Sequence, residues 1–271
     1  MIKVIYTSHR VENLPFFEKE IENVSTVILE EPRNEILSDA IEGKISLDTY
    51  VSLIDTPFPV YTSKLIEMLR KHRDKNILQI EPYLEEVEKL QRFKDGNEKV
   101  REMERKVNLA WLDYTEAFMK KEFDKIIESV INFAKADAER FIMRDVMRAE
   151  VIKKYDSAVV EAGLMHTKLA EILEAETLCI PLEIARILNV EYLENPGNVL
   201  TKSYIYGFDC KEELLAARSL IYVSLVEKKE LLPTPENPYP HFINEQKIIR
   251  FVNKLDYDKC KKIFEKLWYQ K

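Results

Sequence analysis

The chain has little glycine, little cysteine and no strong excess of charge of one sign. Its 271 residues include five glycines, three cysteines and four histidines, and the formal net charge is −7 at pH 7. The cysteines lie far apart without a CxxC pair, which argues against a disulfide framework and a zinc cluster. The acidic balance makes nucleic acid a poor partner, because no phosphate-neutralising excess exists. We therefore expect a protein of a reducing, cytoplasmic setting that does not bind nucleic acid.

Long apolar runs are also missing. No window approaches a membrane span, and the first ten residues lack the apolar stretch of a secretion signal. A composition of 46% hydrophobic and 33% charged residues is that of an ordinary globular protein. Scarce glycine with abundant Ile, Lys and Glu resembles the composition of thermophile proteins. We expect a globular protein without a membrane span.

Four short apolar runs rich in β-branched residues predict strands at 2–6, 25–30, 76–81 and 157–162. Their nearly continuous apolar character is typical of strands that are covered on both faces of a parallel sheet. Helical periodicity separates the first three runs. We therefore predict an α/β fold with a mostly parallel central sheet flanked by helices. Residues 176–189 are expected to add a fifth strand and a short helix.

A long helical pattern interrupts this alternation. Residues 84–155 have helical periodicity, and no proline occurs between positions 83 and 180. We predict a helical insertion at 84–155 within an α/β core formed by 1–83 and 156–209. A helical C-terminal extension is expected at 210–271, broken by a proline-rich loop at 232–241.

Polar side chains follow each predicted strand. The first run leads to His9, the second to Glu30, the third to Glu81, and the fourth passes Glu161 before it reaches His166. The carboxyl ends of parallel strands meet at one edge of a sheet, where ligands bind. Alternation along the fourth strand could turn the Glu161 side chain away from that edge. We expect the other four side chains to lie close together, although each alone could simply mark a strand that meets solvent.

Imidazole and carboxylate together are ligands that suit Zn, Mn, Fe or Co. Such an ion polarises a carbonyl group and lowers the pKa of a water molecule. The same residues could act without metal, with a histidine as general base oriented by a glutamate. The sequence leaves both mechanisms open.

Three arginines and an aspartate precede the fourth predicted strand on one helix. Arg140, Arg144, Asp145 and Arg148 lie within nine residues, and Arg144 and Arg148 share a helix face. Because like charges at this spacing repel, they indicate a carboxylate partner or an anionic ligand. The alternative is a solvated helix face.

The order of these motifs resembles the TraB/Tiki superfamily and, more distantly, the erythromycin-esterase-like and ChaN-like proteins. The resemblance covers about residues 1–175, and the first motif has Tyr6 where a Gly-x-x-His motif has glycine. The matching pieces are YTSH with His9, VILEEP with Glu30, LQIEPYLEEVEKLQ with Glu81, MRDVM with Arg144 and Asp145, and VVEAGLMHTKLAEIL with Gly163 and His166.

This resemblance implies an α/β core in which paired Gly-x-x-His motifs face one another. In the Tiki branch it implies a peptidase that depends on a divalent metal. Erythromycin-esterase relatives hydrolyse an ester with His and Glu, and ChaN-like relatives bind haem.

We therefore expect a hydrolase of amide, peptide or ester bonds that acts with a divalent Mn, Co or Zn ion or, in the alternative, with these residues alone. Gly163 is expected beside the bound cofactor, at an abrupt turn from strand to helix that only glycine makes at little cost. The expected catalytic residues are Glu30, Glu81, His166, Arg144 and Asp145, and the expected metal ligands are His9, Glu30 and His166.

Two other functions stay open. The chain could be a binding or regulatory protein that keeps the fold without the chemistry, since Tyr6 stands in a glycine position. It could also bind haem or a small anion through His and Arg. The expected partner is a small-molecule or peptide substrate, and association with further copies of the chain is left open.

Overall fold

A computed structural model of the chain describes residues 1–54, 56–93 and 95–268. Contacts divide the chain into two compact units. Unit 1 comprises Met1–Glu85, Arg144–Glu191 and Lys228–Phe242. Unit 2 comprises Glu86–Met143, Tyr192–Glu227 and the chain from Ile243 on. Position 94 of the predicted insertion and positions 269–271 of the predicted extension lie outside the described residues.

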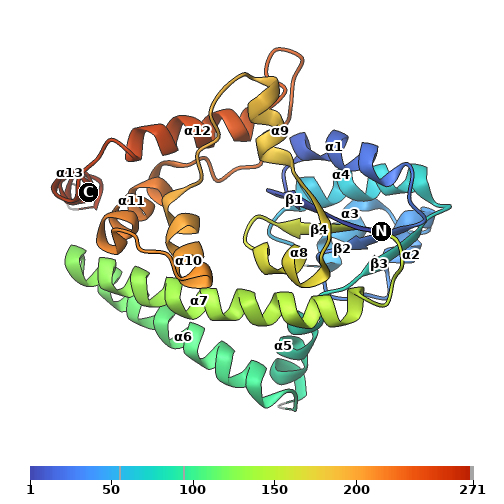
Figure 1. The fold of residues 1–271 in the computed structure, drawn as a ribbon, viewed down its shortest axis with the longest axis horizontal. Coiled ribbons are helices and arrows are strands. Elements are labelled where there is room, and N and C mark those ends of the chain that lie inside the picture. The colour runs from blue at the N-terminus through green and yellow to red at the C-terminus, as the bar shows by residue number, and fades with distance from the viewer. Residues whose placement is uncertain (55, 94, 269–271) are drawn as a thin grey trace. The chain divides into compact units, whose positions relative to one another are not determined.

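Unit 1 is built on a five-stranded parallel sheet with the strand order β3-β2-β4-β1-β5 (Figure 1). The strands are β1 (Ile2–Thr7), β2 (Thr26–Leu29), β3 (Asn76–Gln79), β4 (Ala158–Gly163) and β5 (Glu176–Cys179). The predicted α/β fold with a mostly parallel sheet is confirmed, including the fifth strand.

The fourth strand enters the middle of the sheet. It pairs with β1 through Ile5↔Glu161 and Thr7↔Gly163, and with β2 through Val27↔Val159. Since all strands run in one direction, the residues that follow β1, β2, β3 and β4 leave the sheet at the same edge.

Helices surround this sheet. Those wholly within unit 1 are η1 (Val11–Asn13), α1 (Leu14–Ile21), α2 (Leu37–Glu42), α3 (Leu47–Ile54), α4 (Pro59–Leu69), η2 (Arg70–His72), α8 (Thr167–Leu173) and α9 (Ile180–Ile187). Three further helices contribute residues to both units, namely α5 (Pro82–Phe93), α7 (Phe123–Ile152) and α12 (Pro240–Val252).

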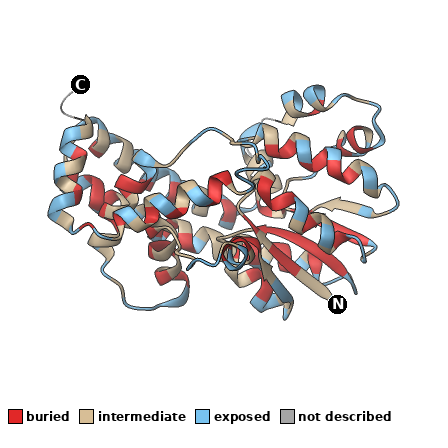
Figure 2. Ribbon diagram, turned by 90° about the horizontal axis from the view of Figure 1, so that it is seen from above, coloured by how far each residue is buried: buried red, intermediate tan, exposed pale blue. Residues whose placement is uncertain are grey.

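Both faces of the central strands are covered. Val4, Ile28 and Val160 pack with Ala149 of α7 and Leu169 of α8. Figure 1 shows α1 and α4 on the other side of the sheet from α8. Strand β2 is buried throughout and β4 nearly so, as the colours of Figure 2 show. This explains the continuous apolar runs, because each fully buried aliphatic side chain contributes about 1.5–3 kcal/mol.

The described part of unit 2 is helical. Besides the parts of α5, α7 and α12, it contains α6 (Glu98–Met119), α10 (Pro196–Tyr206), α11 (Glu212–Leu225) and α13 (Tyr257–Trp268). Its core gathers Phe123, Leu200, Ile221, Val252 and Phe264. The predicted helical C-terminal region is confirmed. Within the described residues, no helix combines the length and the apolar character that crossing a bilayer requires.

The two units do not follow the predicted domain boundaries everywhere. Residues 192–209, expected in the α/β core, belong to unit 2. Residues 228–242, expected in the C-terminal extension, belong to unit 1, as do residues 84–85 and 144–155, which were expected in the helical insertion. Two carboxylates explain the place of the 228–242 segment. Glu230 accepts hydrogen bonds from two backbone amides at the start of α4, and Glu12 accepts two from the start of α12. These bonds tie the 228–242 segment to unit 1.

Candidate functional site

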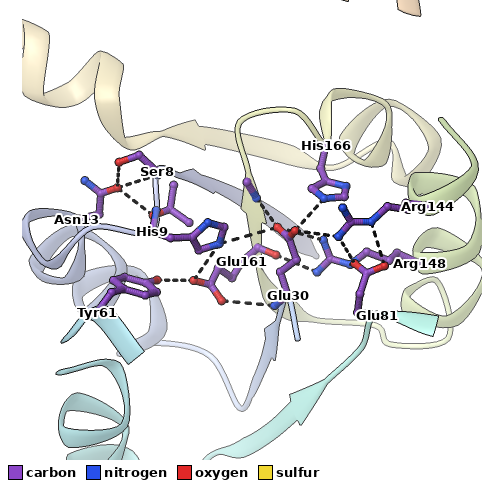
Figure 3. A network of polar contacts seen from close by, with 12 residues as sticks. Ser8, His9, Asn13, Glu30, Tyr61, Glu81, Arg144, Arg148, Glu161 and His166 are labelled. Atoms are coloured by element: carbon purple, nitrogen blue, oxygen red, sulfur yellow. Dashed lines mark hydrogen bonds and ion pairs between the residues drawn. The ribbon is translucent and has the colours of Figure 1, made fainter. Parts of the chain in front are cut away.

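The residues that follow the strands of unit 1 converge on one carboxylate, that of Glu30 (Figure 3). Its Oε1 atom lies 2.8 Å from Nε2 of His166, and its Oε2 atom lies 3.9 Å from Nε2 of His9. Oε1 also accepts a hydrogen bond of 3.2 Å from Nη2 of Arg144. Glu30 thus stands between the two histidines, which arrive from β1 and β4.

Glu81 joins this cluster through two arginines of α7. The Glu81 side chain is fully buried, with its Oε2 atom 3.2 Å from Nη2 of Arg144 and 3.5 Å from Nε of Arg148. Arg148 is also fully buried and donates to the backbone carbonyls of Ile80 and Glu161. The arginines one helical turn apart therefore have carboxylate partners, which is one of the two predicted interpretations of this helix.

Asp145 holds His166 in position. His166 is the N-terminal cap residue of α8, and its Nδ1 atom is hydrogen-bonded to Oδ1 of Asp145. The second oxygen of Asp145 accepts from the backbone amides of Lys168 and Leu169 at 2.9 and 3.0 Å. One carboxylate thereby satisfies two free amides at the helix start and fixes the orientation of the imidazole ring.

The charges in this part of the site support one another. Burial alone would raise the pKa of Glu30, but the imidazole of His166 and the guanidinium of Arg148 outweigh it and hold that pKa well below its usual value. Burial opposes the charged form of His166, yet the carboxylates of Glu30 and Asp145 raise its pKa above the usual value. An imidazolium–carboxylate pair is therefore the favoured state.

His9 lies in different surroundings. It follows β1 with a left-handed backbone (φ 51°), a conformation that costs a residue other than glycine about 1–2 kcal/mol. Side chains of the same turn hold it there. Oδ1 of Asn13 accepts hydrogen bonds from Thr7 Oγ1 and from the amide and hydroxyl of Ser8, and Thr7 Oγ1 accepts one from the His9 amide.

The His9 ring rests on aromatic side chains and faces a second carboxylate. It stacks on Phe58 with 5.8 Å between ring centres and meets Tyr61 edge-on at 5.6 Å. Its Nε2 atom lies 3.8 Å from Oε1 of Glu161. Tyr61 donates its hydroxyl hydrogen to the same oxygen, because burial and the Glu161 charge raise the pKa of Tyr61 well above its usual value. Glu161 is thus a buried acceptor shared by two rings.

Sequence reasoning missed three members of this cluster. The concern that alternation would turn Glu161 away is wrong, since the side chain is buried and reaches His9 and Tyr61. The sequence places Arg148 on a helix face with Arg144 but predicts no role for it at the site, and no sequence pattern points to Tyr61. A signal existed for Glu161, because a charged residue inside an apolar strand requires a partner.

Gly163 is needed for a reason other than the predicted one. It is the last residue of β4 and is not among the glycines with positive φ, so the expected sharp turn is not the cause. Its amide donates to Oε2 of Glu30. A Cβ atom there would lie 3.3 Å from that oxygen and 3.3 Å from Cε1 of His9. Glycine thus allows the Glu30 carboxylate and the His9 ring to lie close to the end of β4. Tyr6 pairs along β1 with Ala162 and Cys179.

Glu30, Glu81 and His166 form a group that could hold a metal ion, because one ligand atom from each lies within 4.8 Å of the others. One imidazole and two carboxylates suit a divalent transition metal. Asp145 occupies the outer position that commonly orients a metal-bound histidine. His9, which was expected as a ligand, is not a member of this group and faces the other oxygen of Glu30. Arg144 and Arg148 would compete with an ion for the same carboxylates.

The chain is 53% identical over 267 residues to a protein of Archaeoglobus fulgidus that is described as uncharacterized, and the match covers 98% of this chain and 99% of that protein. The chain belongs to the same family as this archaeal protein. No family model and no solved structure matches the chain. The TraB/Tiki resemblance stays a prediction.

Proposed function

We propose that the chain is a hydrolase of amide or ester bonds and that the cluster around Glu30 is its active site. One observation supports this proposal above the others. A buried imidazole–carboxylate pair, His166 and Glu30, lies beside a second imidazole, His9, whose side chain is 22% exposed. The site thus combines fixed charge with a base that a substrate can reach.

His9 is suited to move the proton. In the proposed reaction, Nε2 of His9 accepts a proton from the attacking water while the water oxygen bonds to the carbonyl carbon. The imidazolium then returns this proton to the leaving nitrogen or oxygen as the bond to the carbonyl carbon breaks. Glu30 and Glu161, at 3.9 and 3.8 Å, stabilise the charge that His9 carries between these steps.

The remaining residues hold this arrangement. Arg144 contacts both Glu30 and Glu81, which supports the predicted carboxylate partner for this arginine. Asp145 orients His166 and leaves its Nε2 atom directed at Glu30. Glu30 and Glu81 are therefore held by Arg144, and His166 is held by Asp145.

A divalent Mn, Co or Zn ion is part of this proposal. The donor set fits such an ion, which Glu30, Glu81 and His166 would hold, and a bound ion would supply polarisation of the carbonyl group and a lower pKa for water. Binding requires the unprotonated form of the His166 Nε2 atom. We therefore expect metal uptake to release a proton and to weaken as the pH falls.

The test is hydrolysis of a panel of N-acylated peptides, amides and esters by protein that is stripped with a chelator and reloaded with Mn, Co or Zn. We expect His166→Ala and His9→Gln to lower kcat/KM about 100-fold or more. The matched control is His72→Gln. His72 belongs to η2, which precedes β3 rather than following a strand, and its ring lies beside Glu18 of α1. The activity of His72→Gln should equal that of the unmodified chain.

Two results would contradict the proposal. One is the absence of hydrolysis across the whole panel with all three metals. The other is full activity in the His166→Ala variant. Metal content measured by mass spectrometry should be about one ion per chain, and lower in Glu81→Gln, because this change removes one ligand charge.

A further inference from the structure

Two cations of unit 1, Arg10 and Lys228, have no acidic partner among the described residues. Arg10 directly follows His9, and its Nε atom is buried with no hydrogen-bond partner. Lys228 begins the 228–242 segment and is exposed. Arg144 and Arg148 at the neighbouring site contact Glu30 and Glu81, so Arg10 and Lys228 differ in being uncompensated.

The ring of Phe58 places Arg10 beside the proposed active site. The Cζ atom of Arg10 lies 5.0 Å from the centre of this ring, and the His9 imidazole stacks on the same ring. A guanidinium group over an aromatic face is held by a cation–π interaction, which leaves its N–H groups available to an acceptor. Arg10 is thus positioned without its hydrogen-bonding capacity being used.

The 228–242 segment, which begins at Lys228, is hydrogen-bonded to the start of α4. The carboxylate of Glu230 accepts hydrogen bonds of 2.9 Å from the amides of Val60 and Tyr61. These amides open α4, directly after Phe58. Partial burial of the ammonium group and the positive charge of Arg10 lower the pKa of Lys228, which agrees with a position of Lys228 close to Arg10.

Two uncompensated cations, one of them directly after His9 in the chain, favour a negatively charged ligand. A guanidinium offers a planar fork of N–H donors, and an ammonium adds a movable donor, so together they match the oxygens of a carboxylate or a phosphate. Glu30 and Glu81 already have cationic partners in Arg144 and Arg148, so they are not the partners of Arg10 and Lys228.

We propose that Arg10 and Lys228 form a subsite for an anionic oxygen group of the substrate. The substrate would then be an amide or ester that carries a carboxylate or phosphate near the bond to be cleaved. The cleaved bond rests on the proposed hydrolase function, whereas the anion subsite rests on Arg10 and Lys228 alone.

Binding is tested without turnover by NMR titration of the full chain at low ionic strength. The probes are N-acetylglycine, inorganic phosphate and, as the neutral control, N-acetylglycinamide. We expect saturable binding of one or both anions and none of the amide. Arg10→Gln should weaken anion binding about tenfold or more, and Lys228→Gln about threefold, because a guanidinium makes the stronger paired contact. Binding of only one anion identifies the group.

The control variant is Arg73→Gln, which removes the same charge from an exposed position at the end of η2. It should bind the anions like the unmodified chain, and Arg10→Lys should bind with intermediate affinity. Equal affinity in Arg10→Gln and the unmodified chain, or no saturable binding of either anion, would overturn the subsite.

A matched substrate pair separates this proposal from the hydrolase. If a peptide with a free C-terminal carboxylate and its C-terminal amide are cleaved with the same KM, and phosphate does not inhibit, the subsite is wrong while the hydrolase stands. If the anions bind as expected and nothing on the panel is hydrolysed, the hydrolase is wrong and the subsite stands. We expect Arg10→Gln to raise KM about tenfold for the anionic substrate only.

Discussion

The two histidines of the site approach opposite oxygens of one carboxylate from contrasting surroundings. His166 is 2% exposed and lies between Asp145 and Glu30, so charge and hydrogen bonds hold it. His9 is 22% exposed, rests on Phe58 and Tyr61, and keeps 3.8–3.9 Å from its carboxylates. We call His166, Asp145 and Glu30 the inner half of the site, and its side chains are fixed by these contacts. We call His9 with Phe58 and Tyr61 the outer half, which is open to a substrate and in which the backbone of His9 is left-handed.

The largest expected effect concerns Arg148, whose guanidinium group lies against the buried carboxylate of Glu81. Arg148→Met should lower the free energy of unfolding by about 3–5 kcal/mol, because it leaves Glu81 with one cationic partner fewer and two buried carbonyls without a donor. Urea unfolding measures this loss. The matched control on the same helix is Arg140→Met, which breaks a partly exposed pair with Asp137 and should cost about 1 kcal/mol or less. Similar losses for both variants would show that the cluster contributes little.

The next effect concerns the orientation of His166. Asp145→Asn should lower kcat/KM about 100-fold, since the amide no longer selects the orientation and protonation of the ring. Circular dichroism should show a folded protein. Asp137→Asn, on the same helix, should keep full activity. If Asp145→Asn is fully active, the contrast between a fixed and a reachable histidine fails.

Glu31, which has no cationic partner among the described residues, sharpens the comparison. Glu31 follows Glu30 directly and accepts a hydrogen bond from the side-chain amide of Gln79. Burial, together with the charges of Glu161 and Glu30, raises the pKa of Glu31 to about 7. The folded chain then binds a proton that the unfolded chain has lost, so stability should fall as the pH rises from about 4.5 to about 7.

The expected loss from this group is about 2 kcal/mol, allowing for its partial exposure. Glu31→Gln should lack this part of the pH dependence. Urea unfolding at pH 5 and pH 8 gives the free energy of unfolding of the unmodified chain and of Glu31→Gln. The same change between the two pH values in both proteins would show that Glu31 is ionised throughout the range.

The smallest effect isolates the backbone of His9. Both His9→Ala and His9→Gly remove the imidazole, but glycine adopts a positive φ without strain. We expect His9→Gly to be more stable than His9→Ala by about 1 kcal/mol. At His166, where φ is −78°, glycine should bring no such gain. Equal stability of the two His9 variants would show that the turn relaxes when the ring is removed.

Much of the site could be predicted because strand direction is encoded locally. Apolar runs without alternation predict a parallel sheet, and a parallel sheet places the residues after its strands at one edge. His9, Glu30, Glu81 and His166 follow from this rule alone. Glu161 did not, because the direction of a side chain near a strand end depends on the local twist and on its partners.

The roles within the cluster depended on contacts that no local pattern contains. Gly163 lies beside Glu30, 133 residues away, and its need for a missing Cβ atom appears only when His9 and Glu30 are in place. The group that could hold a metal ion includes Glu81 in place of His9 for the same reason, since distances between side chains of different strands decide its membership.

The sequence by itself determined the strands, their common direction and the polar residues at their carboxyl ends, because short-range apolar patterning suffices for each. Only the tertiary structure decided which oxygen of Glu30 faces which histidine and that α7 supplies two arginines to the carboxylates. It alone brought the segment that begins at Lys228 to the start of α4, through a hydrogen bond from the Tyr61 amide to Glu230, 169 residues away. Such contacts depend on the packing of distant segments, which leaves no periodicity in the sequence.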